Sequence, residues 1–337
     1  MRWLATFALA FSLFSVHAPE IPAAAAPGSP PVATFSIVGS DPEAGEVGVA
    51  VASKFFAVGT VVPHGTAGVG AVATQSFANT TFGPRGLELL RQGLSPQAVI
   101  DSLLVGDGDP NRRQVGIVAA DGRSATYTGE GCLAWAGGRS GPNYAAQGNI
   151  LTGEDVVAAM EKAFLETKGK SLAERLFLAL EAGDAAGGDS RGRQSASLLV
   201  KRGRAGYNGF TDIAVDVRVD DHASPIEELG RLLNLALVND GWNQGWTAFT
   251  EERFAEARRW QEATAERAEG VPSMLPEVLY DLAVIRLAAG DAEAAAQALQ
   301  RSVSLNPKLG QAALQDSDLE ALGSRRAEIV ATAGSKP

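Results

Sequence analysis

The feature that most constrains the fold is the order of strand-like and helix-like segments after residue 33. Short runs rich in β-branched and small residues predict strands, and amphipathic segments between them predict helices. Strands are expected at 34–38, 47–51, 58–62, 68–74, 115–119, 124–128, 144–147, 195–201 and 213–219, and helices at 86–91, 96–104, 152–164, 171–182 and 225–238. This order predicts an α+β class, a four-layer αββα sandwich with two packed sheets and helix pairs outside them.

Turn and capping residues mark several boundaries. Residues 41–45 read Asp-Pro-Glu-Ala-Gly and predict a turn that joins the first two strands into a hairpin. Five residues are expected to begin or end helices, with Ser95, Thr152 and Ser171 as N-caps and Gly169 and Gly183 at C-terminal ends. The glycine pairs at 137–138 and 187–188 are expected to form turns.

After Asn239 the pattern becomes helical throughout, which predicts a sandwich domain at 34–239 and a helical tail at 240–337. Tail helices are expected at 251–268, 275–289 and 292–305. The stretch Leu279–Pro307 resembles one tetratricopeptide repeat, with small residues where two helices must pack closely. Because at least three repeats are usually needed for a solenoid, the tail is either a cap docked on the sandwich or a surface for a protein partner.

The N-terminus has the pattern of a secretory signal peptide. Arg2 precedes an apolar run at 3–16, and the alanines at 23–26 offer a cleavage site. We expect a signal peptide at 1–25 and a linker at 26–33, hence a secreted or periplasmic protein without a membrane span after cleavage. The apolar run is short for a span, although an uncleaved anchor is the alternative.

Composition excludes several functions. The net charge of -10 argues against nucleic acid as a partner. The single cysteine, Cys132, excludes an intrachain disulfide, and only three histidines are present. The run 220–222 (Asp-Asp-His) fits a polar turn better than a metal site. No metal or cofactor is therefore expected.

One arrangement needs no histidine. If Thr34 were freed at a chain terminus, its α-amine could act as the base for its own hydroxyl. Lys54 follows the second strand, so the hairpin should bring it close to Thr34, where it would lower the amine pKa and stabilise an oxyanion. Ser36 faces the same side as Thr34. On spacing alone, an ordinary strand threonine and an ordinary surface lysine are the simpler explanation of these residues.

Several long runs in one order carry a family resemblance. They are 34–38 (TFSIV), 48–56 (GVAVASKFF), 68–75 (GVGAVATQ), 127–129 (YTG), 147–149 (QGN), 186–195 (AGGDSRGRQS) and 218–222 (RVDDH). Through these runs, the stretch from Ala33 to Leu237 resembles the domain-of-unknown-function 1028 family, and the tail lies outside the resemblance.

That family is similar to the N-terminal nucleophile hydrolases, which share the αββα sandwich. The resemblance implies that Thr34 is a nucleophile and Lys54 its partner. In family members that begin Met-Thr-Phe-Ser, removal of the methionine exposes the threonine. Here, signal cleavage after Ala25 leaves eight residues, 26–33, before Thr34. A second cut between Ala33 and Thr34 is then required.

Further polar residues are candidates for substrate binding. The segment 187–195 carries Asp189, Arg191, Arg193 and Gln194, and its guanidinium groups could hold a substrate carboxylate. The alternative is a structural loop in which Asp189 pairs with an arginine. Three amide side chains next to predicted turns are candidate oxyanion donors: Gln75, Asn79 and Asn149.

The leading hypothesis is an N-terminal nucleophile-type amide hydrolase that acts on a small peptide-like substrate. The alternative is a non-catalytic binding or scaffold protein that uses the sandwich and the helical tail for protein or ligand interaction. The sequence leaves the substrate and the oligomeric state open.

Overall fold

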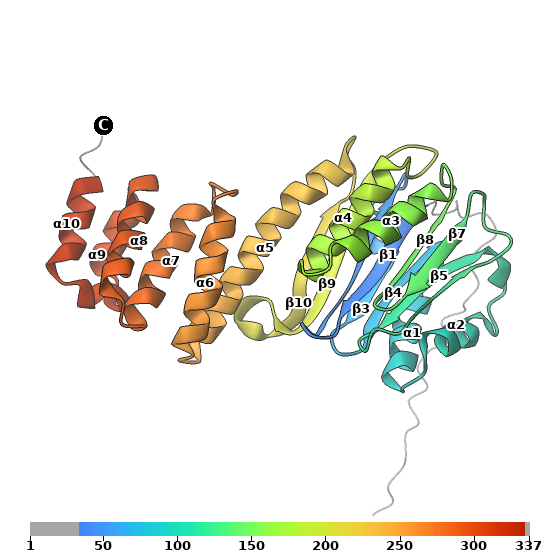
Figure 1. Ribbon diagram of the computed structural model, residues 1–337, viewed down its shortest axis with the longest axis horizontal. Coiled ribbons are helices and arrows are strands. Elements are labelled where there is room, and N and C mark those ends of the chain that lie inside the picture. Colours follow the sequence, from blue (N-terminus) through green and yellow to red (C-terminus); the bar gives the residue numbers. More distant parts are fainter. Residues whose placement is uncertain (1–33, 334–337) are drawn as a thin grey trace, which may run out of the picture.

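Two antiparallel sheets stacked face to face dominate the computed structural model, which describes residues 34–333 (Figure 1). The larger sheet has the order β10–β9–β2–β1–β8–β7, and the smaller has the order β3–β4–β5–β6. The larger sheet contains β1 (Thr34–Asp41), β2 (Glu46–Ser53), β7 (Gly137–Gly141), β8 (Tyr144–Asn149), β9 (Ser195–Ala205) and β10 (Thr211–Val219). The smaller contains β3 (Pro63–Thr66), β4 (Gly70–Ser76), β5 (Arg113–Ala119) and β6 (Ser124–Thr128). The predicted signal peptide and linker, 1–33, lie outside the described residues.

Helices cover the outer faces of the two sheets. They are α1 (Phe82–Arg91) and α2 (Pro96–Leu104) on the smaller sheet, and α3 (Asp155–Glu166) and α4 (Leu172–Ala185) on the larger. Along β1, Phe35 and Ile37 pack under α3 and α4, whereas Val38 joins the valine cluster between the sheets. Both faces of this strand are therefore buried. The α+β prediction is confirmed.

Local signals fixed several element ends. Residues 42–45 form the turn between β1 and β2, with Gly45 at φ +67°. The Ser95 hydroxyl accepts a hydrogen bond from the Ala98 backbone N–H at the start of α2. Ser171 and Glu174 form both bonds of a capping box on α4. These three expectations are confirmed.

Four local predictions were wrong, and in two of them a tertiary contact gives the reason. Val58–Thr60 is a 3₁₀ turn instead of a strand, because the Val58 backbone N–H donates to the Ser195 hydroxyl at 3.1 Å and not to a neighbouring strand. The glycine pair at 137–138 lies in β7 instead of a turn, and α3 starts after Glu154 instead of Thr152. Helix α4 continues past Gly183, where a Cβ would lie 2.7 Å from Met160 Cγ. That glycine permits close packing and does not end the helix.

The tail is a row of helices that extends from the sandwich beyond β10 (Figure 1). Its helices are α5 (Pro225–Thr250), α6 (Phe254–Ala268), α7 (Leu275–Ala288), α8 (Ala292–Leu305), α9 (Leu309–Gln315) and α10 (Ser324–Ala333). Gly290, at φ +85°, and Asp291, whose side chain caps α8, form the short connection between α7 and α8. The likeness to a tetratricopeptide repeat stays a prediction.

Helix α5 belongs to both parts of the chain. It was predicted to end at Val238, but it runs on to Thr250, so the predicted boundary at 239–240 falls inside one helix. Its first half packs on the core of the larger sheet, and Val238 belongs to the separate apolar core of the tail. Gly241 lies inside the helix, where a close contact with Thr264 of α6 requires a residue without a side chain. Within residues 34–333, no helix is both long and apolar enough to cross a membrane.

Candidate functional site

Thr34 is the first residue of β1, in the middle of the larger sheet, and its side chain is fully buried. It pairs with Asn149 of β8, and its hydroxyl donates a hydrogen bond to Ser53 Oγ of β2 at 3.2 Å. The start of β1 therefore meets the ends of both neighbouring strands. Sequence analysis predicted the candidate site at this point, where the hairpin brings the end of the second strand back to Thr34.

A layer of buried amide side chains lies between the sheets beside Thr34. Ser36 donates to Gln75 Oε1 at 2.6 Å and accepts from Gln147 Nε2 at 2.7 Å. Gln75 Nε2 donates to Gln114 Oε1 at 2.9 Å and to the Thr34 carbonyl at 3.3 Å. A buried polar network of this kind holds its members in one arrangement. The Gln75 amide is thus committed to the network.

Three of the sequence candidates lie in or beside this network, namely Ser36, Gln75 and Asn149. Asn149 Nδ2 donates to Gln114 Oε1 at 3.0 Å. Asn79 is used differently, because its amide donates to Asp107 and its carbonyl accepts from Thr81, just before α1. Gln114 and Gln147 were not predicted. Their signals were positional: Gln147 ends a predicted strand and begins the 147–149 run, and Gln114 directly precedes a predicted strand.

Lys54 lies one residue beyond the β2 ladder, at the same end of the sheet as Thr34. Ala52 faces the helices and Ser53 bonds Thr34 between the sheets, so strand alternation places Lys54 and Thr34 on opposite faces. The Lys54 side chain is exposed, and its ammonium donates to the Arg193 carbonyl at 3.3 Å. A direct pairing of Lys54 with Thr34 stays a prediction, and this geometry does not favour it.

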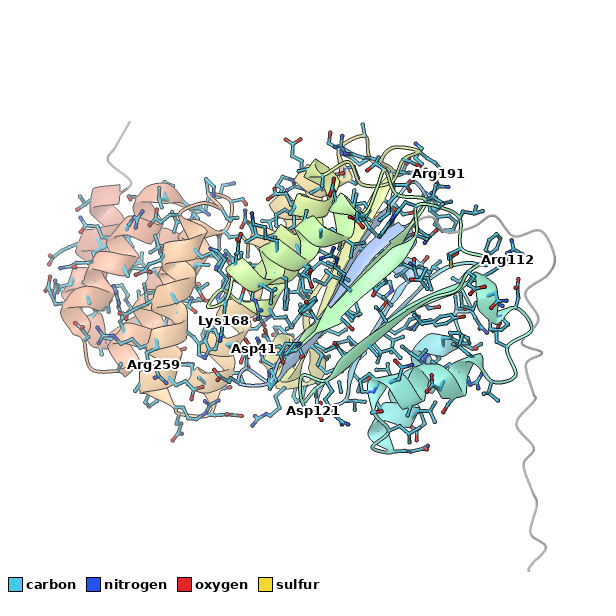
Figure 2. The ribbon with its side chains drawn as sticks, turned by 45° about the vertical axis from the view of Figure 1, so that its right-hand side comes forward. Asp41, Arg112, Asp121, Lys168, Arg191 and Arg259 are labelled. Atoms are coloured by element: carbon cyan, nitrogen blue, oxygen red, sulfur yellow. The ribbon has the colours of Figure 1, made fainter. Side chains whose placement is uncertain are left out.

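The 187–195 loop is held by its own ion pairs. Asp189 accepts from the Lys54 backbone N–H at 2.9 Å and from the Arg191 guanidinium at 2.9 Å (Figure 2 labels Arg191). Arg193 pairs with Asp184 at 2.7 Å, and this bond raises the pKa of the Arg193 guanidinium. Gln194 Nε2 donates to Asp221 at 3.1 Å. The loop is thus ordered by the Asp189–Arg191 pair within it and by contacts with Lys54, Asp184 and Asp221 outside it.

Comparison with known proteins assigns the sandwich domain to a family. The profile of a family of unknown function, DUF1028, matches residues 34–229. The chain belongs to the DUF1028 family. The crystal structure of a Silicibacter pomeroyi protein assigned to DUF1028 is similar, with 30% sequence identity and a TM-score of 0.54, covering 60% of this chain and 89% of that one. No curated protein matches the chain significantly. The tail beyond residue 229 lies outside the DUF1028 match.

A cavity of about 340 Å³ opens beside the candidate site of this DUF1028 domain. Ser53, which bonds Thr34, contributes to its wall, and so do Asp189, Arg193 and Ser195. A volume of this size lies at the lower end of the range for small-molecule pockets. The cavity therefore suits a ligand about the size of one or two amino-acid residues.

Other chemistry in the DUF1028 domain is weak. Burial raises the pKa of the half-buried Cys132 thiol, whose Sγ contacts the Arg113 carbonyl, so this thiol is a poor nucleophile. His222 Nδ1 accepts from the Ser224 backbone N–H, in keeping with a polar turn at 220–222. Within residues 34–333, no group of three acidic, histidine or cysteine side chains could hold a metal ion.

Proposed function

We propose that the DUF1028 domain is an N-terminal nucleophile-type amide hydrolase whose nucleophile is the Thr34 hydroxyl. The observation that carries this proposal is the position of Thr34 at the first residue of the central strand. There, Thr34 meets Asn149 and Ser53, and Ser53 and the 187–195 loop also line a ligand-sized cavity. The proposal requires cleavage between Ala33 and Thr34, because a peptide nitrogen cannot act as a base.

The chemistry would run in two steps. The free α-amine of Thr34, with a pKa of about 8, takes the hydroxyl proton while the oxygen attacks the substrate carbonyl. Collapse of the tetrahedral intermediate returns that proton to the leaving amine and leaves an ester on Thr34. Water, deprotonated by the same α-amine, then hydrolyses the ester and releases the acid. Ser53 would position the attacking hydroxyl through the 3.2 Å bond.

The substrate and location follow from this proposal. A cavity of about 340 Å³ suits a small peptide-like amide. The N-terminal signal pattern supports a location outside the cytoplasm, where a second protease or self-cleavage would expose Thr34.

A covalent probe can test the proposal without a known substrate. One form of the protein would be released from a fusion that is cut directly before Thr34, and a second form would keep Ala33 in front of it. Both would be treated with a peptidyl β-lactone, and the labelled residue would be identified by mass spectrometry. We expect label on Thr34 only in the form that starts at Thr34.

Variants sharpen the same experiment. Thr34→Ala should abolish labelling, and Thr34→Ser should retain it, because serine keeps both the hydroxyl and the amine. Thr80→Ala, at an exposed threonine before α1, is the matched control and should label normally. Equal labelling with and without Ala33, or none in either form, would contradict the proposal.

A binding protein without catalysis is the alternative, and the complete burial of the Thr34 side chain favours it. N-terminal sequencing of the protein from its native host separates the two. Thr34 at the mature terminus supports the hydrolase, and Ala26 there supports the binding protein.

A further inference from the structure

A second and larger cavity lies where the sandwich meets the tail, at the other end of β1 from Thr34. It measures about 890 Å³, within the range of small-molecule sites, and such sites often lie between domains. We call it the interdomain cleft, and it is lined by the β1–β2 turn, β9, the start of α4, and α5 and α6. The residues used below are Asp41, Glu46, Arg202, Asp240, Gln244, Thr247 and Trp260. Figure 2 labels Asp41 on the sandwich side and Arg259, next to Trp260, on α6.

The floor of the interdomain cleft carries more negative than positive charge. The Arg202 guanidinium donates to Glu46 at 2.6 Å and to both oxygens of Asp240 at 2.7 and 2.8 Å. The side chains are 18% exposed for Arg202 and 10% for each carboxylate. Two carboxylates thus share one guanidinium, and Asp41 adds a third acid at the edge. Burial raises the pKa of Glu46, and the nearby charges of Asp240 and Asp41 raise it further, although Arg202 opposes them.

Two polar side chains in the wall have hydrogen-bonding capacity to spare. Thr247 is 6% exposed, and its Oγ1 has no hydrogen-bond partner among residues 34–333. Gln244 Nε2 likewise has no hydrogen-bond partner within the described residues. A buried polar atom without a partner is costly and calls for an explanation. Because both residues line the cleft, a ligand with a hydrogen-bonding group would supply the missing partners.

Trp260 provides an aromatic surface in the opposite wall. It is 37% exposed, and the neighbouring wall is apolar, with Leu237, Ala173 and Ala263. The face of an indole ring attracts cations as well as methylene groups. The edge adds no excess positive charge to that of the floor, because its arginines are matched by carboxylates, Arg253 by Glu251 and Arg267 by Glu174.

We propose that the interdomain cleft binds a small organic cation, namely an ammonium or guanidinium group on a short apolar stem that also carries a carbonyl group. Lysine and arginine residues of peptides have this chemistry. The cation would meet Glu46 and Asp240, the stem would lie on Trp260, and the carbonyl would accept from Gln244. The site is independent of the Thr34 chemistry, because it lies at the opposite end of the sandwich.

Isothermal titration calorimetry on the whole chain tests this proposal. The probes are N-acetyl-L-arginine amide and N-acetyl-L-lysine amide, and N-acetyl-L-citrulline amide is the uncharged match to the arginine compound. We expect both cations to bind, and citrulline to bind at least about tenfold more weakly, since it lacks the charge-assisted bond. Equal affinity for the arginine and citrulline compounds, or no binding of either cation at millimolar concentration, would overturn the proposal.

Variants locate the binding. Glu46→Gln keeps the shape of the floor and removes one charge, so binding should weaken about tenfold. Glu130→Gln, at an exposed glutamate in the β6–β7 loop, is the matched control and should bind normally. If Glu46→Gln fails to fold, Trp260→Leu and Gln244→Leu carry the test, and unchanged affinity in both would place the ligand elsewhere. Thr34→Ala should bind the cation as the parent does, so failure of the hydrolase proposal would leave this one standing.

Discussion

Asp281 is a part-buried carboxylate at the contact between two helices. It lies on α7, and its Oδ2 accepts hydrogen bonds from the indoles of Trp242 and Trp246 on α5, both at 2.6 Å. Burial raises the pKa of Asp281 from its ordinary value of 3.8 to about 6, although the two indole bonds work against that rise. A single carboxylate thus joins the helix that carries the sandwich core to the helices of the tail.

This pKa predicts how the stability of the tail depends on pH. Folded Asp281 holds its proton up to about pH 6, whereas in the unfolded chain it releases the proton near 3.8, so the folded state binds more protons between these values. The contribution of Asp281 to the free energy of unfolding is therefore fully present below 3.8 and is lost as the pH rises through about 6. Asp281→Asn should remove this dependence, so that the variant gains stability relative to the parent as the pH rises.

Urea denaturation of the parent and of Asp281→Asn at several pH values between 4 and 7 measures this difference. The exposed Asp121 of the β5–β6 turn offers a matched control, and Asp121→Asn should follow the parent. A difference between the parent and Asp281→Asn that stays constant with pH would show that Asp281 does not titrate in this range.

Among the elements, the contact between α5 and α6 depends on one missing side chain. A Cβ at Gly241 would lie 2.4 Å from Thr264 Oγ1, and that β-branched side chain cannot easily move away. Gly241→Ala should therefore destabilise the protein by about 1–2 kcal/mol, since overpacking exceeds the gain in helix propensity.

The pair Gly241→Ala and Thr264→Ala tests the contact directly. Removal of the threonine makes room for the new methyl group, so the double variant should recover most of the stability that Gly241→Ala loses. Thermal unfolding of the four proteins in the cycle measures this coupling. Additive losses would mean that the two side chains do not compete for the same space.

The sequence predicted elements well where a local signal agrees with the packing. Helix α2 has its predicted bounds because Ser95 caps it and Pro96 fits its first turn. Helix α4 begins where it was predicted to begin, because Ser171 and Glu174 form a capping box there. Prediction failed at Gly183, because a glycine that permits close packing looks the same in sequence as one that ends a helix.

The candidate site was predictable only in part. Strand order and the hairpin place Thr34 beside the ends of its neighbours, but a one-residue step along β2 decides whether a side chain meets it. That step gives Ser53 the contact and turns Lys54 toward Arg193. The interdomain cleft left no sequence signal, because its walls come from segments far apart in the chain.

At the scale of the whole molecule, the sandwich and the tail have separate apolar cores that meet along α5. Ile226, Leu229 and Leu233 from the first half of α5 fill the core of the larger sheet. A chain truncated after Asn239 keeps these residues and should still unfold in one cooperative thermal transition. A chain truncated after Ser224 loses all three and should lose that transition, because large cavities would remain.

Calorimetry or circular dichroism on the two truncated proteins measures the transitions. If the protein truncated after Asn239 melts without cooperativity, the two cores are one folding unit. If the protein truncated after Ser224 melts normally, α5 contributes little to the sandwich.

Because α5 is uninterrupted, the orientation of the tail is set by residue number. One extra residue in α5 near Asn239 would turn everything after it by about 100° and advance it by about 1.5 Å. Trp260 would then swing away from Arg202, although every residue of both walls were still present. Insertions of about seven residues, close to two full turns, would restore the facing walls at a greater separation. Selection on a ligand held between them would therefore act on the number of residues in this helix as strongly as on their identity.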